Sequence, residues 1–84
     1  MAIIVILNKK NRNEKEELTL EKFKERFKFE LEIAIENFIV SENKKIEYLP
    51  KCMKKEKDAS DFYFDLRWNF NHYSSSEWFI ERIK

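Results

Sequence analysis

The sequence predicts a small α+β domain of β-α-β-β-α order, with a three-stranded sheet packed against one long amphipathic helix and a short C-terminal helix. Three patterns support this fold class: a β-branched run at residues 2–7, apolar residues at three- and four-residue steps through 20–40, and apolar–polar alternation at 61–71. The chain has 84 residues, which is the length of one domain spanning residues 1–84.

The first strand is predicted from the run "AIIVIL" at residues 2–7. A continuous β-branched run is typical of a strand that is covered on both faces or lies inside a sheet. The wholly polar stretch at residues 8–17 is then expected to connect this strand to the helix.

The long helix is predicted from Thr19, which can act as N-cap, to about residue 40. Glu21 lies in the positive first turn, and Leu18 with Phe23 fits a hydrophobic staple. Asn43 can end the helix in a left-handed conformation. The apolar face of this helix comprises Leu20, Phe23, Phe27, Leu31, Ala34, Ile35 and Phe38.

The rest of the chain is expected to form two strands and the short helix. Residues 45–53 indicate a second strand, at an edge or bulged because Pro50 cannot donate a ladder hydrogen bond, and 54–60 a hairpin loop. Residues 61–71 indicate the third strand, paired with the first, and Ser74 and Glu77 fit a capping box that opens the short helix. The apolar side of the third strand is expected to form the core with Phe62, Phe64, Leu66, Trp68 and Phe70.

Composition limits the classes of function. Charged residues make up 39% of the chain but balance to a net charge of +1, which argues against a general polyanion binder and leaves room for a local basic patch. The single cysteine, Cys52, excludes an internal disulfide and a thiolate zinc site, and it fits a reducing, cytoplasmic compartment. The apolar run at the start is too short to cross a membrane. No metal or other cofactor is expected.

The polar side of the third strand is the first candidate for partner binding. Tyrosine and arginine are enriched at binding hot spots, and asparagine makes directional hydrogen bonds. Two other interpretations remain open: a solvated outer sheet face, or a buried polar network beneath the short helix. The candidate residues are Tyr63, Asp65, Arg67, Asn69 and Asn71, with His72 and Tyr73 at the end of the strand.

A lysine-rich hairpin at residues 44–57 is the second candidate. Such a hairpin can follow a phosphate backbone or meet an acidic protein, although lysines on an edge strand also protect against aggregation. The stretch contains no arginine and one aromatic residue, Tyr48. Its candidate contacts are Lys44, Lys45, Lys51, Lys54, Lys55 and Lys57.

A stripe on the back of the long helix is the third candidate. Phe29, Ile33 and Val40 lie opposite the main apolar face, interrupted by Glu36. A helix that is buried on one side does not need these apolar residues. Either a second element covers them, or they contact a partner, which includes a second copy of the chain as a homodimer.

Catalysis finds little support. Cys52, His72 and Asp65 do not have the spacing of a known catalytic motif, and the absence of glycine excludes a phosphate-binding loop. The favoured interpretation is therefore a non-enzymatic protein-binding module, an inhibitor or accessory protein that occupies a surface of a host protein. The excess of lysine over arginine suggests an AT-rich genome and fits a phage or mobile-element anti-defence protein, anti-CRISPR-like in style only. The alternatives are a nucleic-acid binder using the hairpin and, third, a small RNase-like enzyme using His72.

Overall fold

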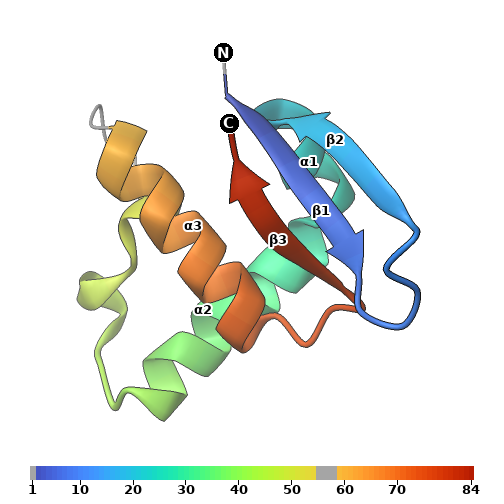
Figure 1. Ribbon diagram of the computed structural model, residues 1–84. Coiled ribbons are helices and arrows are strands. Elements are labelled where there is room, and N and C mark those ends of the chain that lie inside the picture. The colour runs from blue at the N-terminus through green and yellow to red at the C-terminus, as the bar shows by residue number, and fades with distance from the viewer. Residues whose placement is uncertain (1, 55–58) are drawn as a thin grey trace.

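A three-stranded antiparallel sheet of order β2-β1-β3 lies on one side of the protein (Figure 1). The structure is a computed structural model that describes residues 2–54 and 59–84. The strands are β1 (Ile3–Asn8), β2 (Lys15–Thr19) and β3 (Trp78–Ile83). The first strand is confirmed, and its central position agrees with its β-branched sequence, because Ile4, Val5 and Ile6 are fully buried.

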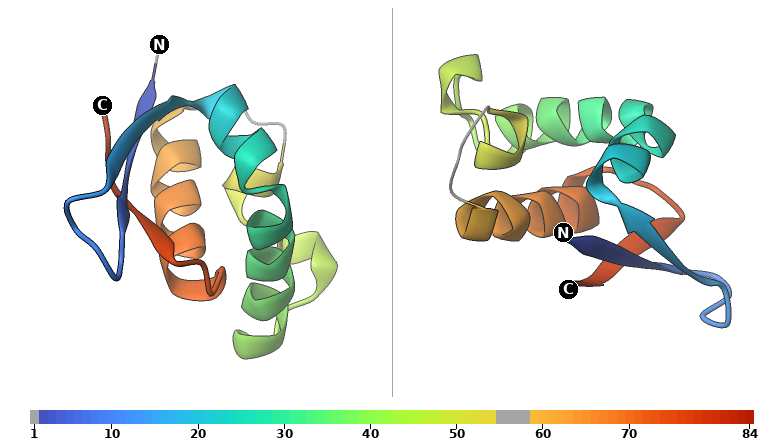
Figure 2. Two further views of the ribbon diagram at one scale, coloured as in Figure 1. Left: turned by 90° about the vertical axis from the view of Figure 1, so that its right-hand side faces the viewer. Right: turned by 90° about the horizontal axis from the view of Figure 1, so that it is seen from above.

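Among the described residues, three α-helices complete the α+β fold: α1 (Leu20–Arg26), α2 (Lys28–Ser41) and α3 (Ala59–Tyr73). Figure 2 shows α3 running beside the sheet, with α2 packed along another side of α3. The predicted class and the predicted number of strands are therefore confirmed. The positions of several elements differ from the prediction.

The predicted long helix is interrupted at Phe27, whose backbone dihedrals are φ −109° and ψ 31°. Thr19 is confirmed as the N-cap of α1, because its Oγ1 accepts a hydrogen bond from the Lys22 N–H at 3.3 Å. Asn43 is confirmed in the left-handed region, at φ 51°. The prediction of a single long helix is thus not exact, since α1 and α2 are separate helices.

Four assignments in the rest of the chain were wrong. Residues 61–71 belong to helix α3 and are not a strand, and the expected C-terminal helix is instead strand β3, which pairs with β1. The expected second strand consists of two 3-10 turns, η1 (Ile46–Tyr48) and η2 (Lys51–Met53). Strand β2 lies in the stretch predicted to be a connection. The expected hairpin loop lies in part outside the described residues, at 55–58.

The core is formed by side chains from α1, α2, α3 and the sheet. Its centre is a group of three aromatic rings, in which Phe23 lies 4.9 Å from both Phe27 and Phe70, and Phe27 lies 5.1 Å from Phe70, between ring centroids. The two contacts with Phe70 are edge-to-face, which is a favourable ring geometry. Apolar side chains from β1, β3 and α3 surround this group. In the described part of the chain, no helix is both long and apolar enough to cross a membrane.

Candidate functional site

Helix α3 carries apolar residues on two opposite sides. An α-helix turns about 100° per residue, so positions four apart form a stripe, and the stripe 64–68–72 lies about 200° around the helix from the stripe 62–66–70. Phe62, Leu66 and Phe70 are buried in the core. In contrast, Phe64 is 70% exposed and Trp68 is 48% exposed. The second stripe is therefore a surface of the protein.

Three rings at four-residue spacing form this surface, which we name the α3 ridge: Phe64, Trp68 and His72. The Trp68 and His72 rings are stacked, with centroids 3.8 Å apart and planes at 20°. His72 Nδ1 lies 3.0 Å from the carbonyl oxygen of Trp68, which also restricts the imidazole. The ridge is thus partly ordered before any partner binds.

Two shallow hollows flank the α3 ridge. One has a volume of about 300 Å³ and is lined by Phe64, Arg67, Trp68, Asn71 and His72. The other, which we name the Asn69 groove, has a volume of about 330 Å³ and lies between α3, α2 and the turn before η2. It is lined by Phe38, Pro50, Phe64, Asp65, Trp68 and Asn69.

The predicted partner-binding residues do not share one face, because they lie on a helix. Arg67, Asn71 and His72 come together beside the ridge. Asn71 also joins α3 to β3, since its Nδ2 donates to the Ile80 carbonyl at 2.9 Å and its Oδ1 accepts from the Ile80 N–H at 2.7 Å. Phe64 and Trp68, which the alternation assigned to the core, are surface residues of this site.

The other predicted residues are directed elsewhere. Tyr63 is half-buried against the core, and Asp65 Oδ2 accepts a hydrogen bond from the Lys51 N–H at 2.9 Å. Tyr73 Oη donates to Glu42 at 2.6 Å, and this hydrogen bond raises the pKa of the Tyr73 phenol. Asn69 is buried between the helices. A single recognition face containing all of these residues is therefore wrong, although the role of each in binding stays a prediction.

The lysine-rich stretch is only partly described, since Lys55 and Lys57 lie outside the described residues. Lys45 and Lys54 are exposed. Lys44 Nζ lies 5.8 Å from the centre of the Tyr48 ring, and Lys51 Nζ forms an ion pair with Asp61 at 2.7 Å. The ion pair of Lys51 reduces the positive charge available to a phosphate backbone.

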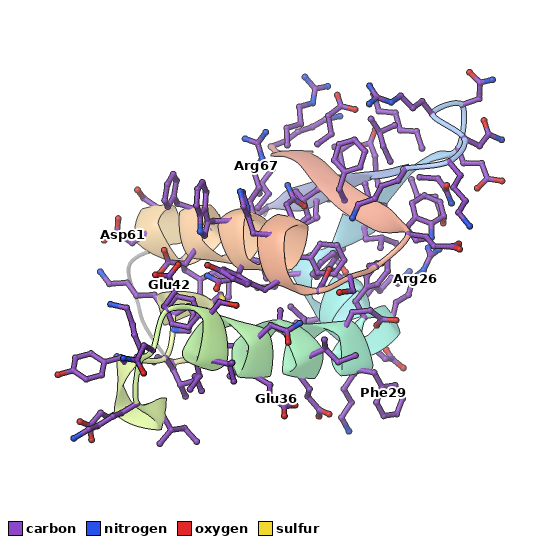
Figure 3. All side chains as sticks on the ribbon, turned by 90° about the horizontal axis from the view of Figure 1, so that it is seen from below. Arg26, Phe29, Glu36, Glu42, Asp61 and Arg67 are labelled. Atoms are coloured by element: carbon purple, nitrogen blue, oxygen red, sulfur yellow. The ribbon has the colours of Figure 1, made fainter. Side chains whose placement is uncertain are left out.

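The stripe on the back of α2 is exposed. Phe29 is 72% exposed and Val40 is 74% exposed, and Ile33 is also exposed, so no described element covers the stripe. Figure 3 shows Phe29 and Glu36 on the outer side of α2 and Arg67 on the outer side of α3. The α2 stripe and the α3 ridge therefore belong to different surfaces, and contact of the stripe with a partner stays a prediction.

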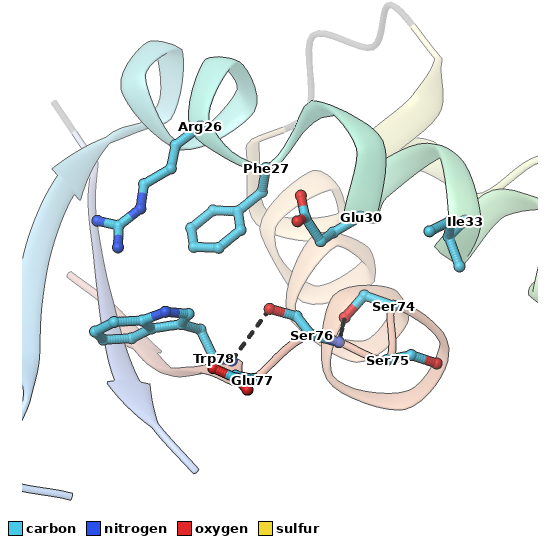
Figure 4. Close-up of a pocket in the computed structure, with 9 residues that line it drawn as sticks. All are labelled: Arg26, Phe27, Glu30, Ile33, Ser74, Ser75, Ser76, Glu77 and Trp78. Atoms are coloured by element: carbon cyan, nitrogen blue, oxygen red, sulfur yellow. Dashed lines mark hydrogen bonds between the residues drawn. The ribbon is translucent and has the colours of Figure 1, made fainter. Parts of the chain in front are cut away.

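A third hollow, of about 500 Å³, lies between the junction of α1 and α2 and the loop before β3 (Figure 4). The Arg26 guanidinium lies 5.0 Å from the Trp78 ring and 5.2 Å from the Phe27 ring, and it forms an ion pair with Glu16 at 2.9 Å. Glu30 Oε2 is buried and accepts no hydrogen bond from a described residue. Because Glu30 lies in the positive first turn of α2, the helix itself stabilises this carboxylate.

Cys52, one of the residues considered for catalysis, is a buried thiol. Burial, together with the nearby Asp65 carboxylate, raises the pKa of the Cys52 thiol to about 12, so Cys52 stays a protonated core residue near neutral pH. Within residues 2–54 and 59–84, no group of three or more His, Cys, Asp or Glu side chains could hold a metal ion.

No protein-family model, curated protein or solved structure matches this chain.

Proposed function

We propose that this protein is a small non-enzymatic binding module that occupies a surface of another protein through the α3 ridge and Arg67. The observation that carries the proposal is the exposure of two large rings, Phe64 and Trp68, on one side of α3 beside Arg67. Aromatic residues and arginine contribute most of the binding energy in many interfaces.

The restricted geometry of the ridge also favours binding. Association loses free energy when side chains must be ordered at the interface. The stack of Trp68 on His72 and the two hydrogen bonds between Asn71 and Ile80 order this surface in advance. A smaller part of the binding energy is then lost to ordering.

The finer role rests on the sequence. The proposed activity as an inhibitor or accessory protein of the phage anti-defence type is supported by the small size, the near-neutral charge and the lysine-rich, glycine-free composition. The single, buried Cys52 supports a cytoplasmic location. Nucleic-acid binding is the competing function, and its candidates are Lys44, Lys45 and Lys54, which form no ion pair with another described residue.

Capture from a lysate of the host tests the proposal with a matched pair of variants. Phe64→Ala and Phe29→Ala remove the same side chain from almost equally exposed positions on α3 and α2. We expect one dominant protein to be retained by the wild type and by Phe29→Ala. We expect its loss with Phe64→Ala and with Trp68→Ala, and retention after nuclease treatment.

Two results would contradict the proposal. Loss of the captured protein after nuclease treatment would assign the function to nucleic-acid binding by the lysines. Capture of the protein that depends on Phe29 but not on Phe64 would place the interface on α2. Circular dichroism spectra of all variants must match the wild type, so that a loss of binding reports a lost contact and not unfolding.

A further inference from the structure

The Asn69 groove combines apolar walls with one unpaired polar atom. Its walls are the rings of Phe38, Phe64 and Trp68 together with Pro50. Asn69 also lines it and is only 3% exposed, and its Oδ1 is buried without a hydrogen-bond donor from any described residue. A buried amide oxygen without a donor costs stability, so this atom calls for an explanation.

The orientation of the Asn69 amide follows from its other end. Its Nδ2 donates to the carbonyl oxygen of Asp65 at 2.9 Å, which can only accept, so the nitrogen must be on this side and the oxygen on the other. Asp65 also lines the groove, and its carboxylate accepts a hydrogen bond from the Lys51 N–H. The side-chain oxygen of Asn69 is therefore the buried, unpaired atom at this groove, and it is an acceptor.

A ligand for this groove should be an apolar ring with a hydrogen-bond donor and no acceptor that becomes buried. The volume of about 330 Å³ is at the lower end of the range for small-ligand pockets, which suits a single ring system. The indole of tryptophan is a donor only. A phenol would bring its own acceptor oxygen toward a groove whose unpaired buried atom, Asn69 Oδ1, is itself an acceptor.

The geometry points to a tryptophan side chain of the partner protein as the occupant, with its indole N–H donating to Asn69 Oδ1. This inference rests on the proposed function. Because Oδ1 is buried, the ring enters after the exposed Phe64 side chain at the rim changes rotamer, a motion that exposed side chains make within nanoseconds. The competing occupant is a guanidinium, which would bind the Asp65 carboxylate.

Titration of the ¹⁵N-labelled protein with indole and with 1-methylindole tests the hydrogen bond. The two probes have nearly the same shape, but 1-methylindole has no donor. We expect indole to shift the Asn69 side-chain amide resonances and to bind about threefold to tenfold more tightly than 1-methylindole, the range of one neutral hydrogen bond.

Asn69→Leu is the control variant, because leucine has a similar shape and no acceptor. We expect it to fold and to bind both probes with equal affinity. The inference is overturned if wild-type protein binds the two probes equally, if indole leaves the Asn69 resonances unchanged, or if methylguanidinium binds more tightly than indole.

The capture experiment separates this inference from the proposed function. If capture depends on Phe64 and Trp68 but the probes bind equally, the binding module stands and the tryptophan inference fails. If the probes differ but capture is insensitive to the ridge, the proposed function fails, and the assignment of the occupant to that partner fails with it.

Discussion

Phenylalanine at positions 64 and 70 of α3 provides a direct test of the fold and of the site. Phe70 is fully buried and contacts Phe23 and Phe27 edge-to-face, whereas Phe64 is 70% exposed. Replacing a buried phenylalanine with alanine costs about 3–5 kcal/mol, which includes the cavity left behind. Replacing an exposed residue usually changes the free energy of unfolding by less than about 0.5 kcal/mol.

The expected loss at Phe70 is large relative to the whole stability. A domain of this length has a free energy of unfolding of about 4–13 kcal/mol, at about 0.05–0.15 kcal/mol per residue. Phe70→Ala should therefore lower the melting temperature by at least about 12 °C, and it can unfold the protein altogether. Phe70→Leu keeps a large apolar side chain and should cost only about 1–2 kcal/mol, so it remains measurable in that case.

Urea denaturation followed by circular dichroism measures both positions on the same scale. We expect a clear loss with Phe70→Ala or Phe70→Leu and almost none with Phe64→Ala. Equal losses at positions 64 and 70 would refute the helix, because a strand at 61–71 would place both rings on the core side. They would also remove Phe64 from the candidate binding surface.

Two further predictions concern buried and local groups. Burial raises the pKa of Cys52 from the ordinary 9.0 to about 12, so the unfolded state loses this proton at a lower pH than the folded state. The free energy of unfolding should therefore fall as pH rises from about 9 to about 12, by at most about 1.4 kcal/mol per pH unit. Denaturation at several pH values should show a shallower fall for Cys52→Ala, and identical slopes would contradict the raised pKa. Thr19→Ala removes the N-cap of α1 and should cost about 1 kcal/mol by urea denaturation, while Thr19→Ser, which keeps the hydroxyl, should cost clearly less.

The parts of the fold that sequence predicted correctly depend on local chemistry. The β-branched run at residues 2–7 has few alternatives to a buried strand, and Thr19 caps a helix through its own hydroxyl. The same holds for Asn43, because asparagine tolerates the left-handed region better than most residues. These features do not depend on distant parts of the chain.

The other two strands depend on tertiary contacts. Strand β2 is polar and largely exposed, and it exists because it pairs with β1 from Ile3↔Thr19 to Leu7↔Lys15. The serines before β3 resemble a helix cap, but Ser74 Oγ and Ser76 Oγ accept hydrogen bonds from the Ser76 and Trp78 N–H groups and form turns. Local patterns alone could not distinguish these outcomes.

The alternation at residues 61–71 led to the wrong assignment of a strand, because a pattern that repeats every two residues also repeats every four residues. Every second residue is apolar, and every fourth residue falls on one side of a helix, so the same letters describe one strand face or two helix stripes. On a helix only the stripe of Phe62, Leu66 and Phe70 is required for the core. The presence of a second stripe, at Phe64 and Trp68, then needs a reason outside the core.

Exposure alone does not select α3 as the binding surface, because Phe29 on α2 is equally exposed. The two surfaces differ in how far they are ordered. Phe29 has no ring contact within the described part of the chain, whereas Trp68 is stacked on His72, and Asn71 holds the same turn of α3 to β3. Since an ordered surface loses less entropy on association, equal apolar contacts yield tighter binding on α3 than on α2. The capture experiment with Phe64→Ala and Phe29→Ala therefore tests preorganisation as well as location.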